Sequence, residues 1–176
     1  MKRVDPELEL SSLHEIAIQI CVAARTAPKG KGKDLLQTAV VSGSDKQHLA
    51  DKMREIAVRD GVGFFARDAE NLDISPLVIL IASRKEPLGL PHCGYCGFID
   101  CEAMEAAGGT CSFNTGDLGI AIGSAASRAA DLRLDNRVMY SAGKAALELD
   151  FFPAEFQLAY ALPISVSGKS PFFDRG

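Results

Sequence analysis

Four of the chain's five cysteines lie close together, within residues 92–112. They are Cys93, Cys96, Cys101 and Cys111, spaced C-x2-C-x4-C-x9-C. Gly94 and Gly97 allow tight turns between them, which can direct successive sulfur atoms toward one point and leave room beside the main chain. This arrangement suits a metal centre better than a set of disulfides. We therefore predict that these four side chains bind metal, with iron–sulfur favoured.

Other uses of four thiols stay open. C-x2-C with two further cysteines is also an ordinary tetrahedral zinc set, so zinc is the main alternative. Disulfides are disfavoured, because residues 1–6 lead into an acidic amphipathic segment instead of a secretory signal, which indicates a reducing cytoplasm. A thiol redox sensor on Cys93 and Cys96 would need local positive charge, and His92 is the nearby candidate.

Length and composition limit the class of protein. A chain of 176 residues with 47% hydrophobic residues can form one well-buried domain, which we expect to span 1–176 with the cysteine-rich segment 92–112 inside it. No apolar run reaches the roughly 18 residues of a membrane span. The net charge of -4 gives no bulk attraction for nucleic acid. We expect a cytoplasmic protein that uses neither membrane nor nucleic acid.

The apolar pattern predicts an alternation of helices and strands. Residues 77–82 (Leu-Val-Ile-Leu-Ile-Ala) are apolar on both faces, which predicts a central strand covered on both sides. Cys21 lies on the apolar stripe of a first helix and is interpreted as a core thiol. Ser44 and Gln47 form a capping box, and Thr115 is the expected N-cap of a long helix. The predicted helices are 6–27, 44–60, 100–107, 115–132 and 142–149, and the predicted strands are 38–42, 77–82, 136–140 and 156–166. This order predicts an α/β (α+β) layered sandwich, a mixed sheet covered by helices, with the cysteine segment as an insertion.

The cysteine segment resembles a known motif. Residues 93–104 resemble C-x-x-C-G-x-x-x-C-x-x-x-A, which binds a [4Fe–4S] cluster in several anaerobic redox proteins. The resemblance implies a [4Fe–4S] cluster on the four cysteines. Taken together, helix 6–27, the cysteine segment and the C-terminal tail resemble an uncharacterised family described as containing a ferredoxin-type domain.

The frame around this segment resembles the flavin-binding nitroreductases. Residues 23–29 resemble a helix ending in A-x-x-A-P-S, and residues 117–123 resemble the D-x-G-x-A stretch of a dimer-interface helix. Residues 162–166, with Lys169 and Arg175 beyond, resemble the family's last strand and its basic residues. The resemblance implies a homodimer with FMN held between subunits, and FMN-dependent oxidoreductase activity.

A basic loop follows the first helix. Residues 29–33 read Lys-Gly-Lys-Gly-Lys, and their backbone N–H groups and ammonium groups favour a phosphate. Basic side chains on the helix and the tail would add charge-assisted contacts if the tail folds back. The predicted cofactor-binding residues are Arg25, Lys29, Gly30, Lys31, Lys169 and Arg175. The alternative is a solvated surface loop.

These features favour a small redox protein with an iron–sulfur cluster and FMN beside it, which serves a redox partner or a small-molecule substrate. A zinc-stabilised, non-catalytic binding protein of the same fold is the first alternative, and a thiol redox sensor is the second. Neither a G-x-S-x-G elbow, an H-E-x-x-H pair nor a P-loop occurs, so no catalytic residue is assigned.

Overall fold

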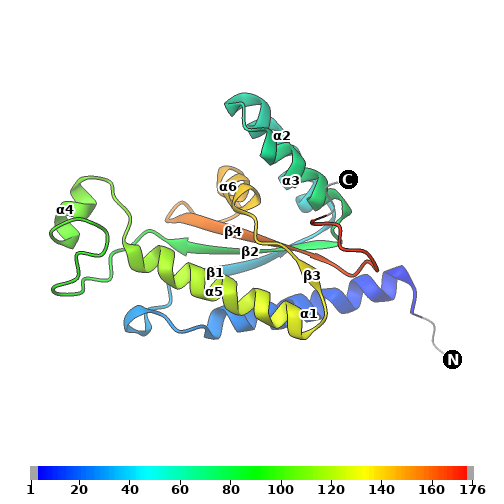
Figure 1. The fold of residues 1–176 in the computed structure, drawn as a ribbon, viewed down its shortest axis with the longest axis horizontal. Helices are drawn as coiled ribbons and strands as arrows, with labels where there is room; N and C mark the ends of the chain where they lie inside the picture. The colour runs from blue at the N-terminus through cyan, green and yellow to red at the C-terminus, as the bar shows by residue number, and fades with distance from the viewer. Residues whose placement is uncertain (1–3, 174–176) are drawn as a thin grey trace.

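A computed structural model describes residues 4–173, apart from the side chain of Pro6, as a sheet between two layers of helices (Figure 1). The strands are β1 (Leu36–Val41), β2 (Leu77–Arg84), β3 (Asp135–Asn136) and β4 (Phe156–Ser165), in the spatial order β1-β2-β4-β3. Neighbouring strands are antiparallel throughout, which corrects the expected mixed sheet. Two helices instead of one connect β1 to β2, so the chain returns to the end of the sheet where β1 finished and β2 runs back beside it.

β2 is the centre of the core. Residues 77–83 are buried, which confirms the strand that was expected to be covered on both faces. Its side chains alternate between two apolar clusters. Val78, Leu80 and Ala82 belong to one cluster, whereas Leu77, Ile79 and Ile81 belong to the other.

The helices divide between the two faces of the sheet. α2 (Gly43–Asp60), α3 (Gly63–Ile74) and α6 (Tyr140–Glu148) cover the face of the first cluster. α1 (Pro6–Thr26) and α5 (Ser112–Asp131) cover the opposite face and pack on each other. Cys21 packs against that second cluster, as expected of a core thiol. Burial raises the pKa of the Cys21 thiol, which keeps it in the neutral form.

The helix termini differ from the expected caps in two places. α2 begins at Gly43 with Ser42 as N-cap, and Gln47 donates to Asp51 instead of forming a capping box. Gly61 ends this helix in the left-handed conformation, as expected. α5 begins three residues before Thr115, whose hydroxyl donates back to the Ser112 carbonyl at 2.9 Å and caps nothing.

The C-terminal tail docks on the body of its own chain. Phe172 is 2% exposed and belongs to the cluster beneath α2, α3 and α6. Arg137 donates to the Phe172 carbonyl oxygen at 3.2 Å and lies over the ring of Phe173. Arg175 lies outside the described residues.

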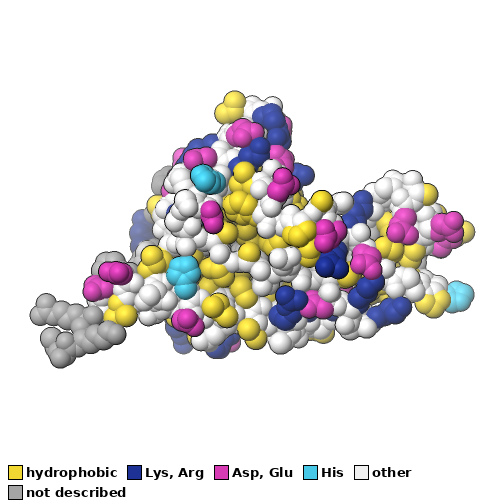
Figure 2. Space-filling model, turned by 180° about the vertical axis from the view of Figure 1, so that it is seen from behind, with side chains coloured by type: hydrophobic (Ala, Val, Ile, Leu, Met, Phe, Trp, Pro, Cys, Tyr) yellow, Lys and Arg dark blue, Asp and Glu magenta, His cyan; other side chains and the backbone are white. Residues whose placement is uncertain are grey.

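Figure 2 shows the back of the molecule, where hydrophobic side chains gather at the centre between the upper helices and the lower layer. Acidic and basic side chains are interspersed around them on this face. Within residues 4–173, no helix combines the length and the apolar character that crossing a membrane requires.

Candidate metal centre

The cysteine segment forms a lobe at one end of the sheet. The chain leaves β2, passes through residues 85–100, forms the short helix α4 (Cys101–Ala106), and then enters α5 (Figure 1). α4 and its flanking loops project beyond the sheet. The lobe is therefore attached through two arms, residues 85–91 and the first turn of α5.

All four predicted metal ligands meet in this lobe. Their side chains line one cavity of about 120 Å³, together with residues of the loop and of α4. Cys111 is 7% exposed, and the other three thiols are half-buried and unbridged. The lining residues are Leu90, Pro91, His92, Cys93, Gly94, Cys96, Phe98, Ile99, Asp100, Cys101, Met104, Cys111 and Ser112.

The four thiols surround the cavity without converging on a single point. Among the described residues, no group of three or more His, Cys, Asp or Glu side chains is close enough to hold one metal ion. Thiolate sulfur is the ligand of both structural zinc and iron–sulfur clusters, so the chemistry of the donor set fits either group.

The backbone of the lobe turns where the sequence predicts. Gly94 and Gly97 have φ angles of 62° and 85°, and the Gly97 N–H donates to the Gly94 carbonyl at 2.9 Å. Both glycines occupy the left-handed region that a side chain disfavours. Cys93 and Cys96 flank this turn, so it determines how their side chains approach the cavity.

The other two cysteines lie at helix N-termini. The Asp100 carboxylate accepts from the Ala103 N–H at 2.8 Å and caps α4, which places Cys101 at the first helical position. Cys111 is the N-cap of α5, a helix of 20 residues. The positive end of a helix dipole stabilises a negatively charged thiolate or cluster.

Polar and aromatic contacts tie the lobe to the body. The buried Asn114 side chain accepts from the Glu86 N–H at 3.0 Å and donates to the Glu86 carbonyl at 2.8 Å, so it joins α5 to the incoming arm. Tyr95 stacks on Phe113, with ring centroids 6.0 Å apart. Sequence reasoning missed Asn114, because the helix was expected to begin after it, at Thr115.

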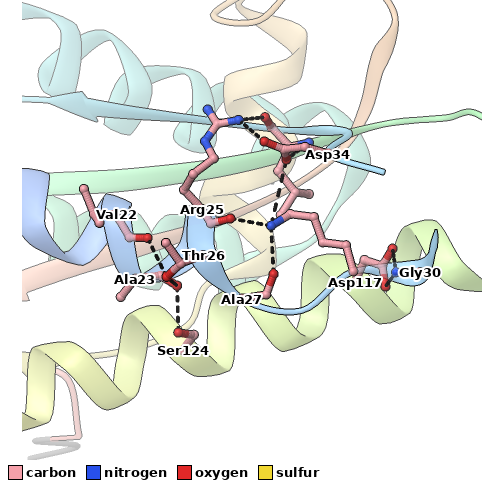
Figure 3. A network of polar contacts seen from close by, with 11 residues as sticks. Val22, Ala23, Arg25, Thr26, Ala27, Gly30, Asp34, Asp117 and Ser124 are labelled. Atoms are coloured by element: carbon pink, nitrogen blue, oxygen red, sulfur yellow. Dashed lines mark hydrogen bonds and ion pairs between the residues drawn. The ribbon is translucent and has the colours of Figure 1, made fainter. Parts of the chain in front are cut away.

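The basic loop after α1 is satisfied by groups of the same chain (Figure 3). The Gly30 N–H is shared between the two carboxylate oxygens of Asp117, at 3.1 and 3.0 Å. Lys29 Nζ donates to the Arg25 and Ala27 carbonyls at 2.5 and 2.9 Å. These groups therefore do not form a ready phosphate site.

The remaining predicted phosphate contacts are also engaged or lie elsewhere. Lys31 Nζ donates to the Leu88 carbonyl at 3.2 Å. Arg25 pairs with Asp34 at 2.5 Å; burial alone would raise the pKa of that carboxyl, but the hydrogen bond from Arg25 holds it below its ordinary value. The Lys169 N–H donates to the Ser167 hydroxyl within the tail, and Arg175 lies outside the described residues. The described members of the predicted FMN-phosphate set thus bond to groups of this chain.

The C-terminal part of the chain matches a described protein family, and one relative matches nearly the whole chain. Residues 107–175 match the family described as "Uncharacterized protein containing a ferredoxin domain (DUF2148)". A protein of Archaeoglobus fulgidus is 38% identical to this chain over 167 residues, which cover 90% of this chain and 89% of that protein.

Solved structures show the same fold at low identity. An FMN-dependent nitroreductase from Clostridium difficile is 20% identical with a TM-score of 0.56, and the match covers 96% of this chain and 79% of that one. A nitroreductase with bound FMN from Desulfitobacterium hafniense is 18% identical with a TM-score of 0.54, covering 89% and 80%. An FMN-dependent nitroreductase from Mycobacterium smegmatis has a TM-score of 0.61 at 11% identity, covering 88% and 78%. The chain has a nitroreductase-like fold, and it belongs to the family of proteins described as containing a ferredoxin domain.

Proposed function

We propose that this protein is a small redox protein that holds a [4Fe–4S] cluster on Cys93, Cys96, Cys101 and Cys111. The observation that carries the proposal is that all four thiols line one cavity. The ferredoxin domain in the description of the family supports it. When bound, such a cluster supplies a one-electron redox couple.

The protein contributes ligands, shielding and an access route. Cys111 and Met104 are buried on the inner side of the cavity, where they keep water from the centre. Tyr95 and Ile99 are 78% and 90% exposed on the same lobe. A redox partner, or a small-molecule substrate, approaches the centre from this exposed side. The balance of burial and solvent access around the cluster tunes its reduction potential.

Iron and sulfide analysis tests the proposal. Protein purified without oxygen should contain about four iron and four sulfide per chain and absorb near ~400 nm, with bleaching by dithionite. Cys93→Ser should lose most of the iron, whereas Cys21→Ser, a core thiol outside the lobe, should keep it.

Two other outcomes would select the alternatives. About one zinc and no iron per chain would indicate a zinc-stabilised binding protein of the same fold. Metal-free protein with loss of reactive Cys93 and Cys96 after mild peroxide would indicate a thiol redox sensor.

FMN is a second cofactor that we propose on the strength of the fold. Solved structures of this fold include nitroreductases described as FMN-dependent or with bound FMN. A flavin beside the cluster would make the protein an FMN-dependent oxidoreductase, with hydride chemistry supplied by the flavin. Flavin released from anaerobically purified protein, measured by fluorescence, tests this cofactor; a flavin-free preparation that also fails to bind added FMN would contradict it.

We also propose a homodimer. Ile18 and Val22 on α1 and Ile120 on α5 are about half exposed, at 54%, 55% and 48%, on the helical layer that covers one face of the sheet. Gly119 and Gly123 leave open space beside them, so a second copy can approach the backbone of α5. Light scattering should give twice the mass of one chain, and Ile120→Glu should lower it to one chain; a monomeric wild-type protein would contradict the dimer.

A further inference from the structure

Asp117 holds the position at which the basic loop would bind an anion. Its side chain is 8% exposed, and both of its oxygens face the Gly30 N–H at 3.1 and 3.0 Å (Figure 3). A Cβ at Gly30 would lie 2.4 Å from Leu88 Cδ1 and 3.1 Å from Phe113 Cδ1. The space around this N–H is therefore filled by protein, and its hydrogen-bonding capacity is used by an internal carboxylate.

The cations of the loop are used in the same way. The side chain of Lys29 is 6% exposed, and its ammonium group donates to two carbonyls at the end of α1. Lys31 donates to the Leu88 carbonyl, and Lys33 pairs with Glu86. Each ammonium group of the loop thus has a hydrogen-bond or ion-pair partner within the chain.

The contacts of Lys29 stay at the end of α1, whereas the other contacts of the loop reach the incoming arm of the cysteine lobe and the second turn of α5. Leu88 and Glu86 belong to the arm that leads to Cys93, and Asp117 belongs to the early part of α5, the helix that Cys111 caps. The two arms are also joined to each other by Asn114. The basic loop therefore lies as a strap between the incoming arm of the lobe and the second turn of α5, directly after the other attachment.

We infer that Asp117 takes the place of a bound phosphate: it closes the loop 29–33 to phosphate and makes the loop a strap that positions the cysteine lobe. Asp117 is a positioning residue in this scheme, acting through Gly30 and Phe113 on the backbone around Cys111. The positioning half rests on the proposed cluster. The closure to phosphate does not.

The inference that loop 29–33 does not bind phosphate is tested with inorganic phosphate, FMN and riboflavin. In thermal unfolding at constant ionic strength, phosphate should leave the midpoint of the wild-type protein unchanged relative to chloride. If the protein binds flavin, its affinities for FMN and for riboflavin should agree within about twofold. A phosphate held by two charge-assisted hydrogen bonds would instead make FMN bind about tenfold or more tightly than riboflavin. Stabilisation of the wild type by phosphate that Lys31→Met abolishes would overturn the inference.

Opening the loop provides the converse test. Asp117→Asn keeps the size and one acceptor oxygen but removes the negative charge, so phosphate should now raise its unfolding midpoint. Asp51→Asn, at an exposed carboxylate on α2 that also accepts hydrogen bonds, is the matched control and should not respond. If Asp117→Asn does not fold, the comparison of wild type with Lys31→Met still decides whether the loop binds phosphate.

Positioning is tested on the cluster. Asp117→Asn should release iron to a chelator several-fold faster than the wild type and shift the electron paramagnetic resonance spectrum of the reduced protein, whereas Asp51→Asn should do neither. Identical release and spectra in all three proteins would refute the strap. A wild-type protein without a cluster would refute the proposed function and the positioning role together, and the phosphate measurements would still decide closure.

Discussion

Gly143 has no room for a side chain where α6 crosses β4. A Cβ at this position would lie 2.2 Å from the Ala159 carbonyl oxygen and 2.7 Å from the Tyr160 Cα. Both are backbone atoms of a strand paired with β2, so they cannot move aside as a flexible side chain can. Gly143→Ala must therefore displace α6 or distort β4.

Two opposing effects determine how much Gly143→Ala changes the free energy of unfolding. Alanine is favoured over glycine inside a helix by about 1 kcal/mol. Overpacking a closed contact costs about 1–3 kcal/mol, and the contact here is with rigid backbone, which places it at the upper end. We expect Gly143→Ala to lower the free energy of unfolding by about 1–2 kcal/mol after the helix gain is subtracted.

Urea denaturation followed by circular dichroism measures this change. Gly63→Ala is the matched control, because Gly63 begins α3, has no atom within 4 Å of its added Cβ, and should become more stable by about 0.4–1 kcal/mol. Equal or greater stability of Gly143→Ala than of the wild type would refute the close approach of α6 to β4.

Three further predictions concern the tail, an ion pair and a thiol. Phe172→Ala removes a ring that is 2% exposed and should cost about 3–5 kcal/mol in urea denaturation; a loss below about 1 kcal/mol would show that the tail is not docked. The pKa of Asp34 is lowered in the folded protein, so its contribution to stability is present above the ordinary value of 3.8 and is lost as the pH falls through the lower folded value. Asp34→Asn should therefore flatten the decline of stability in acid, and an unchanged acid profile would contradict the Arg25 pairing. Burial raises the pKa of Cys21, so iodoacetamide should alkylate it more slowly in the native protein than after unfolding; equal rates would place it at the surface.

The layered fold was predictable because its strongest signals are local. The apolar run at 77–82 identified β2, and Gly61 identified the end of α2. α3 was missed, since Gly63-Phe64-Phe65 opens it without a capping side chain. The antiparallel pairing of β1 and β2 was missed for the same reason. A connection of two helices brings the chain back to the end of the sheet where β1 finished, so β2 runs in the opposite direction. Thr115 is not an N-cap, because it lies inside α5 and its hydroxyl donates to the Ser112 carbonyl of the same helix.

The candidate site was predictable to a different extent in its two parts. Cysteine spacing alone brought the four thiols to one cavity, since short gaps and left-handed glycines restrict where the sulfur atoms can go. The partners of the basic loop could not be predicted, because its sequence shows cations and N–H groups but not the groups to which they bond. Asp117 lies 87 residues from Gly30, and such a pairing is visible only after α5 has packed against α1.

The iron and acid-labile sulfide content of the wild-type protein, purified and analysed without oxygen, tests the central claim most directly. About four iron and four sulfide per chain, lost in Cys111→Ser and kept in Cys21→Ser, is the predicted result. A protein that holds no iron after anaerobic reconstitution, or that holds the same iron without Cys111, would contradict a cluster in the cysteine lobe.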